Sequence, residues 1–426
     1  MTEIRLGIAG LGTVAQGVLE LIRRNNALMQ QRSGVSLRVV RVASRRAKPE
    51  VDLQGAQFST EIDDLLTDPN VDMILELIGG DTVALELIRR ALAANKPVVT
   101  ANKAVLAAHG NELMSGHGQQ LLRFEAAVAG AIPIIQGMSG GLAANRLASL
   151  FGIINGTCNY IFGEMEANGT AFDEVLAEAQ RLGYAEAEPS FDVDGIDAAH
   201  KLTILAAIAF GQKPDFAAAL VQGIRDVSAV DFTFANQLGF RIKLVGVAAP
   251  GQVPRMQTCL LPLSSQLAKV NGVLNAVEFY GEPVGSVLAI GPGAGGGATS
   301  SAVLADIIDV AHDRGGMPFG RPVAQLADTT DQPGAGLADT PFYVRLMVVD
   351  EPGVLAGVTG ILQKHMISVE SMIQQGRAPG DVVALVMTTH EIASTKLWQA
   401  LDEMTSLPSV KARPVAMPIF AADQEG

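Results

Sequence analysis

The sequence predicts an α/β protein of three units: a parallel-sheet unit at the N-terminus, an α+β unit inserted into it, and a small βαββαβ unit at the C-terminal end. Three observations predict this class. The first 125 residues alternate short apolar runs with helical patterns, the composition changes after them, and a segment rich in Pro and Gly precedes the last part of the chain. The length of 426 residues agrees with two or three domains of roughly 150 residues each.

In the first unit, strands and helices are expected to alternate. Buried strands are expected at residues 4–9, 36–43, 71–78, 97–100 and 119–125, and helices at 13–24 and 82–94. Strands that are apolar along their whole length are typical of a parallel sheet with both faces covered. The segment GPGAGGG (291–297) and a helix at 299–312 are expected to return the chain here. This unit would then comprise residues 1–130 and about 293–318.

The inserted unit, residues 131–292, is predicted from a change in composition. Residues 126–163 carry one charged side chain, Arg146. Helical patterns follow at 173–182 and 195–210, and strand-like runs at 241–248 and 273–279. A mixture of this kind predicts an α+β arrangement rather than a continuation of the parallel sheet.

The third unit follows a linker. Residues 319–341 are expected to form the linker, because 321–341 are rich in Pro, Gly, Asp and Thr. In residues 342–426, strands are expected at 342–350, 368–374, 381–388 and 410–420, with helices at 353–365 and 394–401. The order βαββαβ predicts a ferredoxin-like module.

Composition and charge exclude several classes of protein. A hydrophobic content of 48% excludes a disordered chain. The net charge of −13 argues against nucleic acid as a partner, because phosphates would be repelled. Two cysteines are too few for a disulfide framework, the N-terminus has no export signal, and the uncharged stretches 126–145 and 283–305 are broken by Gly and Pro. We therefore expect a cytoplasmic protein without a membrane span.

A glycine-rich turn follows the first predicted strand. GLGTVA (10–15) matches G-x-G-x-x-A between a strand and a helix, the context that makes this motif informative. Gly10 permits the tight turn, Gly12 lets a pyrophosphate approach the backbone, and Thr13 and Val14 open the helix whose N–H groups would face the phosphates. The motif predicts a Rossmann-type dinucleotide-binding domain. The alternative is a glycine turn that only packs.

The end of the second strand bears on the choice of cofactor. NAD-binding folds usually place Asp or Glu there to hold the ribose 2′-hydroxyl. This chain has VASRR (42–46), with no acid and with Arg45 and Arg46. Two guanidinium groups suit a 2′-phosphate, so NADP is favoured and NAD is the alternative. The competing interpretation is a pair of solvated surface arginines.

Two motifs are expected where the inserted unit faces the cofactor. TANK (100–103) follows the strand at 97–100, so Thr100 and Lys103 would lie at the carboxyl edge of the sheet, where ligands bind in open α/β folds. NGTCNYI (155–161) ends a strand and starts a helix, with Asn155 or Thr157 available as its cap.

The segment LGYAEAEPSFDVDGIDAAHK (182–201) has the densest concentration of chemical groups. Asp197 and Lys201 are an i, i+4 pair if a helix begins near Gly195. A lysine held in this way can donate a proton to a reacting oxygen. The alternatives are carboxylates that stabilise a helix N-terminus and an Asp–Lys surface ion pair. Five carboxylates precede the lysine: Glu186, Glu188, Asp192, Asp194 and Asp197.

Other candidates for chemistry are weaker. His200 is about 100° around the helix from Lys201, so a structural role is expected. The six histidines and two cysteines have no zinc-ligand spacing. Cys158 has no nearby histidine in sequence, which argues against a thiol nucleophile.

Six motifs together resemble the homoserine dehydrogenase family. They are GLGTVAQGV, TANK, FEAAVAGAIPII, NGTCNYI, LGYAEAEPSFDVDGIDAAHKL and GPGAGGGATSSAV, in this order. The tail FYVRLMVVDEPGVLAGVTGIL resembles an ACT domain, an amino-acid-sensing module. The resemblance spans nearly the whole chain, and the segment 182–202 is its most specific part. It implies that the inserted unit is a substrate and dimerisation domain.

The resemblance implies a role for each matching residue. Lys201 would exchange the proton at the substrate oxygen, and Asp197 would be a catalytic, substrate-contacting carboxylate. Glu186 would bind the substrate amino group, and Lys103 would lie near both nicotinamide and substrate. Cofactor contacts are implied at Gly10, Gly12, Thr13, Val14, Arg45, Arg46, Thr100, Lys103 and Gly295. A monovalent cation, usually sodium in the family, would bind largely through backbone carbonyls at Glu125, Val128, Gly130 and Ile132.

Three positions depart from the family pattern. Glu188 replaces an aspartate and Phe124 a frequent tyrosine, and neither change removes a group with a named role. GGGA (295–298) lacks the usual Pro before the Thr, which puts the cofactor contact near Gly295 in doubt.

The resemblance implies the reduction of L-aspartate 4-semialdehyde to L-homoserine with NADPH, a step in threonine, methionine and isoleucine biosynthesis. The ACT domain implies a homodimer or homotetramer inhibited by L-threonine, which would bind at the turn of Pro352 and Gly353. A pairing module without a ligand is the alternative. For the whole chain, the alternatives are an oxidoreductase of another amino-acid semialdehyde and a non-catalytic amino-acid sensor.

Overall fold

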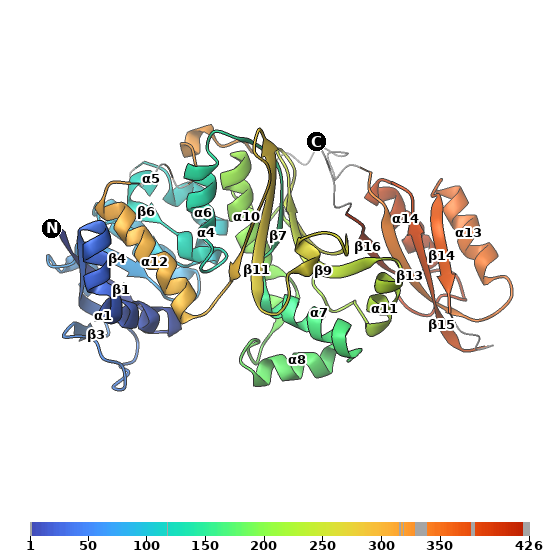
Figure 1. Ribbon diagram of the computed structural model, residues 1–426, viewed down its shortest axis with the longest axis horizontal. Coiled ribbons are helices and arrows are strands. Elements are labelled where there is room, and N and C mark those ends of the chain that lie inside the picture. The colour runs from blue at the N-terminus through green and yellow to red at the C-terminus, as the bar shows by residue number, and fades with distance from the viewer. Residues whose placement is uncertain are drawn as a thin grey trace.

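The computed structural model describes residues 2–116, 118–314, 317, 319–328, 339–375 and 380–420. Three sheets follow one another along the long axis of the molecule (Figure 1). The N-terminal sheet lies at one end, the second sheet in the middle, and the C-terminal sheet at the other end. The sequence order of the units is thus also their spatial order.

The first sheet is parallel, with the strand order β3-β2-β1-β4-β5-β6. This is the order of a dinucleotide-binding α/β fold, so that fold prediction is confirmed. From β1 the chain adds strands first toward one edge of the sheet and then, from β4 on, toward the other edge. Such folds bind ligands at this switch point between β1 and β4, at the carboxyl ends of the strands. The strands are β1 (Thr2–Ala9), β2 (Val35–Ala43), β3 (Gln57–Ser59), β4 (Met73–Glu76), β5 (Val98–Thr100) and β6 (Leu122–Arg123).

Helices cover both faces of this sheet. A late helix, α12 (Gly296–Ala311), packs on α1 (Thr13–Ser33) and shares its apolar core. The two helices approach closely because Gly17 has no side chain: a Cβ there would lie 2.5 Å from the carbonyl oxygen of Gly296. The other helices are α2 (Asp64–Thr67), α3 (Thr82–Ala93), α4 (Lys103–Leu113) and α5 (Gly118–Leu121).

The second sheet is mainly antiparallel, in the order β12-β11-β7-β9-β10-β8. Its central helix, α10 (Ile196–Phe210), is buried along most of its length between α4 and the sheet. The strands are β7 (Arg146–Ile153), β8 (Leu220–Val221), β9 (Phe240–Ala248), β10 (Arg255–Pro262), β11 (Leu274–Glu282) and β12 (Gly285–Pro292). The remaining helices are α6 (Ile134–Gln136), α7 (Gly156–Asn168), α8 (Phe172–Arg181), α9 (Ser190–Val193) and α11 (Ala229–Gln237).

The C-terminal unit has the predicted βαββαβ order, in an antiparallel sheet β14-β15-β13-β16. Its last strand is shorter than the predicted 410–420, although Val410 forms an isolated bridge with Val348. The elements are β13 (Phe342–Val349), α13 (Val354–Lys364), β14 (Val369–Gln374), β15 (Val382–Thr389), α14 (Ser394–Met404) and β16 (Val415–Pro418).

A buried ion pair joins the C-terminal sheet to α11. Asp231 is fully buried, and its Oδ1 accepts hydrogen bonds from Arg345 Nε at 2.7 Å and from the Tyr343 hydroxyl at 2.8 Å. A second junction forms where the Phe420 N–H donates to the carbonyl of Leu260 in β10. Because removing one partner of a buried pair leaves an uncompensated charge, Asp231 constrains how the C-terminal unit docks.

The first described part of the predicted linker, residues 319–328, packs against the body of the protein. Phe319 and Leu326 are buried, and Phe319 contacts Phe124 with ring centroids 5.7 Å apart. The Ala327 N–H also donates to Gly211 at the end of α10. These apolar anchors are the reason that this part does not run free in solvent. Residues 329–338 of the predicted linker lie outside the described residues.

Among the described residues, no helix combines the length and the apolar composition that a membrane span requires.

Candidate active site

Helix α10 presents Asp197 and Lys201 side by side. The helix begins directly after Gly195, whose φ of +82° is a conformation that glycine adopts without strain. Lys201 Nζ donates to Asp197 Oδ2 at 2.8 Å and to the carbonyl oxygen of Ile154 at 3.0 Å. The two side chains are only 12% and 8% exposed, so the predicted i, i+4 pair exists but is not a surface ion pair.

A second ammonium reaches the same carboxylate from the first unit. Lys103, the first residue of α4, places Nζ 3.0 Å from Asp197 Oδ1. The preceding Asn102 caps α4 by accepting the N–H of Val105, and its own N–H donates to the Thr100 hydroxyl. Each oxygen of Asp197 therefore contacts a different lysine, one from each side of the boundary between the two units.

Asn155 has the predicted role of a helix cap and, in addition, contacts two carboxylates, which the sequence did not predict. Its Oδ1 accepts the N–H of Cys158, so Asn155 is the cap of α7, and the Thr157 hydroxyl donates instead to Tyr184. The Nδ2 of Asn155 donates to Asp197 Oδ2 at 2.9 Å and to Asp192 Oδ1 at 2.8 Å. One amide group thus bridges the two carboxylates.

The charges in this cluster shift the pKa of both aspartates. Burial alone would raise the pKa of Asp197, but the ammonium groups of Lys201 and Lys103 outweigh it and hold that pKa well below its usual range. Burial and the negative charge of Asp197 raise the pKa of Asp192. Asp197 is therefore the permanent anion of the cluster.

The neighbouring histidine and cysteine are both buried. His200 is buried and packs against Phe216, with ring centroids 4.0 Å apart. Burial, assisted by the charge of Lys103, lowers the pKa of His200 to about 4, so the ring is neutral near pH 7. Burial raises the pKa of the Cys158 thiol, which opposes thiolate formation. The structural interpretation of both residues agrees with this geometry.

The other predicted carboxylates lie outside the cluster. Asp194 pairs with Arg225 at 2.5 Å, and Glu188 accepts the N–H and hydroxyl of Ser190. Glu186 is exposed, and within the described structure its carboxylate has no hydrogen-bond partner. Of the five acids in residues 182–201, only Asp192 and Asp197 are brought together.

The glycine turn after β1 is tightly packed at Gly10 and open at Gly12. Gly10 has φ +98°, and a Cβ there would lie 2.5 Å from the Leu77 carbonyl oxygen. A Cβ added at Gly12, the residue before α1, would meet no atom within 4 Å, so this side of the turn is open. Gly295 precedes α12, and Gly296 packs against Thr13 at the start of α1. Two helix N-termini therefore meet, which favours an anionic ligand.

Arg45 and Arg46 lie after Ser44, the residue that follows β2, and both are exposed. Neither forms an ion pair within the described chain. Both remain available for the predicted contact with a 2′-phosphate, and the geometry does not distinguish this role from that of solvated surface arginines.

A buried glutamate that the sequence analysis did not single out lies at the end of β4. Glu76 accepts the N–H of Ile78 at 2.8 Å and the hydroxyl of Thr100 at 2.5 Å, and it is fully buried. Asn102 Nδ2 also donates to the carbonyl of Gly80. These bonds tie the loop after β4 to the turn that carries Lys103. The only signal in the sequence was one acid inside an apolar strand.

The segment expected to hold a cation is buried and rich in carbonyls. The carboxylate of Glu125 is already occupied, because it accepts the N–H groups of Ile135 and Gln136. Gly130 has φ +56°, and a Cβ there would lie 2.7 Å from the carbonyl oxygens of both Pro292 and Gly293. Among the described residues, no group of three or more His, Cys, Asp or Glu could hold a metal ion. Any cation here would therefore depend on backbone oxygens.

Comparison with known proteins agrees with this geometry. The homoserine dehydrogenase family matches residues 133–308, and the NAD-binding domain of homoserine dehydrogenase matches residues 10–121. A homoserine dehydrogenase from Pseudomonas aeruginosa is 42% identical over 426 residues, which cover 96% of this chain and 97% of the relative. The chain belongs to the homoserine dehydrogenase family.

Solved structures of homoserine dehydrogenases have the same fold. The crystal structure from Thiobacillus denitrificans has a TM-score of 0.91 at 41% identity and covers 99% of both chains. A hyperthermophilic archaeal homoserine dehydrogenase in complex with NADPH has a TM-score of 0.63 at 26% identity, covering 74% of this chain and 100% of that one. As a homoserine dehydrogenase, this protein is an NAD(P)-dependent oxidoreductase that acts on a CH–OH group.

Glu76 should make the stability of this homoserine dehydrogenase depend on pH. Burial raises its pKa to about 7 from an ordinary value of 4.5. Between these values the unfolded chain releases the proton and the folded chain keeps it, so the free energy of unfolding falls as pH rises. Glu76→Gln should abolish this part of the decline, about 3 kcal/mol between about pH 4 and pH 8, in urea unfolding.

Glu86→Gln, on the exposed face of α3, is the matched control and should follow the unmodified protein. If the Glu76→Gln protein shows the same decline as the control, the Glu76 carboxyl group is not held neutral in the folded state.

Proposed function

We propose that this chain is an NADP-dependent homoserine dehydrogenase that interconverts L-homoserine and L-aspartate 4-semialdehyde. The proposal extends to its place in threonine, methionine and isoleucine biosynthesis. One observation carries the chemistry: Asp197 holds the ammonium groups of Lys201 and Lys103 where α10 faces the carboxyl edge of the first sheet. The family supplies the substrates, and this cluster supplies a proton donor beside a fixed negative charge.

Lys201 is the proposed proton donor to the substrate oxygen. An ammonium group has three N–H donors, and two of them are bound by Asp197 and Ile154. The third is available for the carbonyl oxygen of the semialdehyde as negative charge develops on it. When bound, NADPH supplies the hydride that reduces the carbonyl carbon. In the direction of homoserine oxidation, the proton returns to Lys201.

Asp197 and Lys103 position the reactants. The anionic Asp197 fixes both ammonium groups, so the charge that stabilises the reacting oxygen is oriented before substrate binds. Lys103 is 29% exposed and can contact a ligand at the edge of the first sheet. Glu186, exposed with an unengaged carboxylate, is the proposed partner of the substrate ammonium group.

The cofactor site is proposed at the turn after β1. Gly10, Gly12, Thr13 and Val14 would hold the pyrophosphate, with Gly295 facing it from the start of α12. Further proposed contacts are Thr100 and Lys103 near the nicotinamide, and Arg45 and Arg46 at the 2′-phosphate. The open space beside Gly12 and the meeting of two helix N-termini support binding of a dinucleotide. The preference for NADP rests on Arg45 and Arg46 alone.

A monovalent cation, with sodium the proposed ion, would bind through the backbone oxygens of Glu125, Val128, Gly130 and Ile132. The buried, carbonyl-rich surroundings of Gly130 support this donor set, since hard cations prefer oxygen ligands.

The C-terminal unit is proposed to be an ACT domain that binds L-threonine. Gly353, with φ +96°, precedes α13 and follows Pro352, so free N–H groups at this turn can bind a carboxylate. We further propose a homodimer or homotetramer. We propose the units as residues 1–130 with about 293–318, 131–292 and 342–426.

Lys201→Ala should lower kcat by about 10²–10³, because one preorganised donor to the developing oxyanion is lost. Its Kd for NADPH should stay unchanged, measured by quenching of cofactor fluorescence. Lys269→Ala, an exposed lysine outside the site, is the control. Near-normal turnover of Lys201→Ala would remove Lys201 from the role of proton donor.

The double variant Arg45→Ser, Arg46→Ser should raise the Kd for NADPH by about 10- to 100-fold and leave the Kd for NADH unchanged, because charge-assisted bonds to the 2′-phosphate are lost. Calorimetric titration with both cofactors measures this, with Arg24→Ser in α1 as the control. A strong preference of the unmodified enzyme for NADH would contradict the assignment.

L-Threonine should inhibit the full chain, and a chain that ends at Thr340 should lose this inhibition because it lacks the turn at Pro352 and Gly353. Initial rates with increasing L-threonine measure both, after circular dichroism shows that the shortened chain is folded. Inhibition that persists in the shortened chain would place the effector elsewhere.

A further inference from the structure

An exposed aromatic ring lies beside the active-site cluster. Phe191, in the short helix α9, is 42% exposed, although it belongs to the segment that carries Asp192 and Asp197. The ammonium nitrogen of Lys103 lies over this ring, 5.6 Å from its centroid. This distance is within the range of a cation–π interaction, in which the negative face of an aromatic ring attracts a cation.

The backbone that carries this ring is anchored on both sides. The residue before Phe191 is Ser190, whose hydroxyl oxygen accepts a hydrogen bond from Arg225 Nη2 at 3.1 Å. The residue after it is Asp192, which accepts a hydrogen bond from Asn155 Nδ2 at 2.8 Å. The exposure of the ring is therefore not the result of a loosely held segment.

The ring of Phe191 also contacts a buried ring. Its centroid lies 5.6 Å from that of His200, and His200 in turn packs on Phe216 with centroids 4.0 Å apart. His200 lies in α10, the helix of the catalytic pair, and is 8% exposed. A ring that is held by its neighbours in this way can in turn hold a cation in place.

Lys103 is the less constrained of the two ammonium groups in the cluster. Lys201 is 12% exposed and donates to both Asp197 and the carbonyl oxygen of Ile154. Lys103 is 29% exposed, and within the described residues Asp197 is its one ion-pair partner. Because a lysine side chain has many rotamers, a single contact leaves its nitrogen several positions, and a second contact selects among them.

We propose that Phe191 is a positioning residue of the active site, whose ring holds the ammonium group of Lys103 against Asp197. The ring comes from the inserted unit and the lysine from the first unit, so this contact adds to the ion pair between them. The inference rests on the proposed contact of Lys103 with the substrate. Since binding depends on how precisely such groups are placed, the effect of Phe191 reaches the substrate through Lys103.

The test is the Kd of L-homoserine for the full-length enzyme saturated with NADPH, measured by calorimetry. NADPH cannot accept a hydride, so no turnover disturbs the titration. Phe191→Leu, which keeps an apolar side chain without an aromatic face, should raise this Kd by about 2- to 30-fold, the range for a lost cation–π contact. Phe191→Tyr, which keeps the aromatic face, should bind like the unmodified protein. An unchanged Kd in Phe191→Leu would overturn the inference.

A double-mutant cycle with Lys103→Met separates positioning from direct packing. Lys103→Met should raise the Kd, and adding Phe191→Leu should raise it no further, because the ring acts only through the ammonium group. A further rise in the double variant would mean that the ring contacts the substrate itself or only supports the segment, and would overturn the inference. If Lys103→Met leaves the Kd unchanged, the proposed contact of Lys103 with substrate is wrong, and the inference fails with it.

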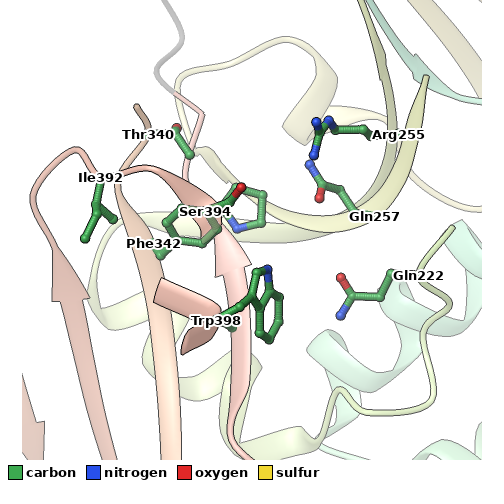
Figure 2. Close-up of a pocket in the computed structure, with 10 residues that line it drawn as sticks. Gln222, Arg255, Gln257, Thr340, Phe342, Ile392, Ser394 and Trp398 are labelled. Atoms are coloured by element: carbon green, nitrogen blue, oxygen red, sulfur yellow. The ribbon is translucent and has the colours of Figure 1, made fainter. Parts of the chain in front are cut away.

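Trp398→Leu is the matched control. Figure 2 shows Trp398 beside a cavity between the C-terminal unit and the second sheet. Its ring is 38% exposed, close to the value for Phe191, but it belongs to α14, so this variant should bind L-homoserine with an unchanged Kd. If Phe191→Leu does not fold, a trifluorinated phenylalanine in place of Phe191 provides the same test, because fluorine weakens the negative face of the ring and leaves its shape. An unchanged Kd would again overturn the inference.

Discussion

The structure depends on the contact of one buried carboxylate with two ammonium groups. Asp197 accepts Lys201 from its own helix and Lys103 from the first unit, so a single anion joins the nucleotide-binding sheet to the helix that carries the proton donor. Burying this carboxylate is unfavourable by itself, and the two lysines compensate for it. The same charge pairs that stabilise the interface also orient the groups that act on substrate.

The surroundings of Asp197 limit where those groups can move. Asn155 binds Asp197 and Asp192 with one amide group, while its carbonyl oxygen caps α7. On the other side, Glu76 bonds to Thr100, and Thr100 accepts the N–H of Asn102, next to Lys103. Both ammonium groups are therefore supported by buried and part-buried hydrogen bonds, which is what electrostatic preorganisation requires.

The sequence was sufficient where a feature depends on local periodicity or on a strand–turn–helix pattern. It predicted the parallel sheet, the glycine turn at Gly10 and Gly12, the pairing of Asp197 with Lys201, and the βαββαβ order. It could not predict contacts that arise when separate units dock. Three such contacts join residues far apart in the chain. They are the ion pair between Lys103 and Asp197, the two hydrogen bonds that the Asn155 amide donates to carboxylates, and the packing of Phe319 against Phe124. For Glu186 the position in the sequence did not indicate its place in the structure. This acid belongs to the most informative segment, yet its side chain is exposed.

The central claim is that Lys201, held by Asp197, faces the oxygen attached to the carbon that is oxidised or reduced. The most direct measurement is a crystal structure of the enzyme with NADP⁺ and L-homoserine bound. We expect the Nζ of Lys201 within hydrogen-bond distance of the homoserine hydroxyl oxygen, with Asp197 still in contact with both lysines. A hydroxyl group bound by other residues, with the Lys201 amine directed away from it, would contradict the account.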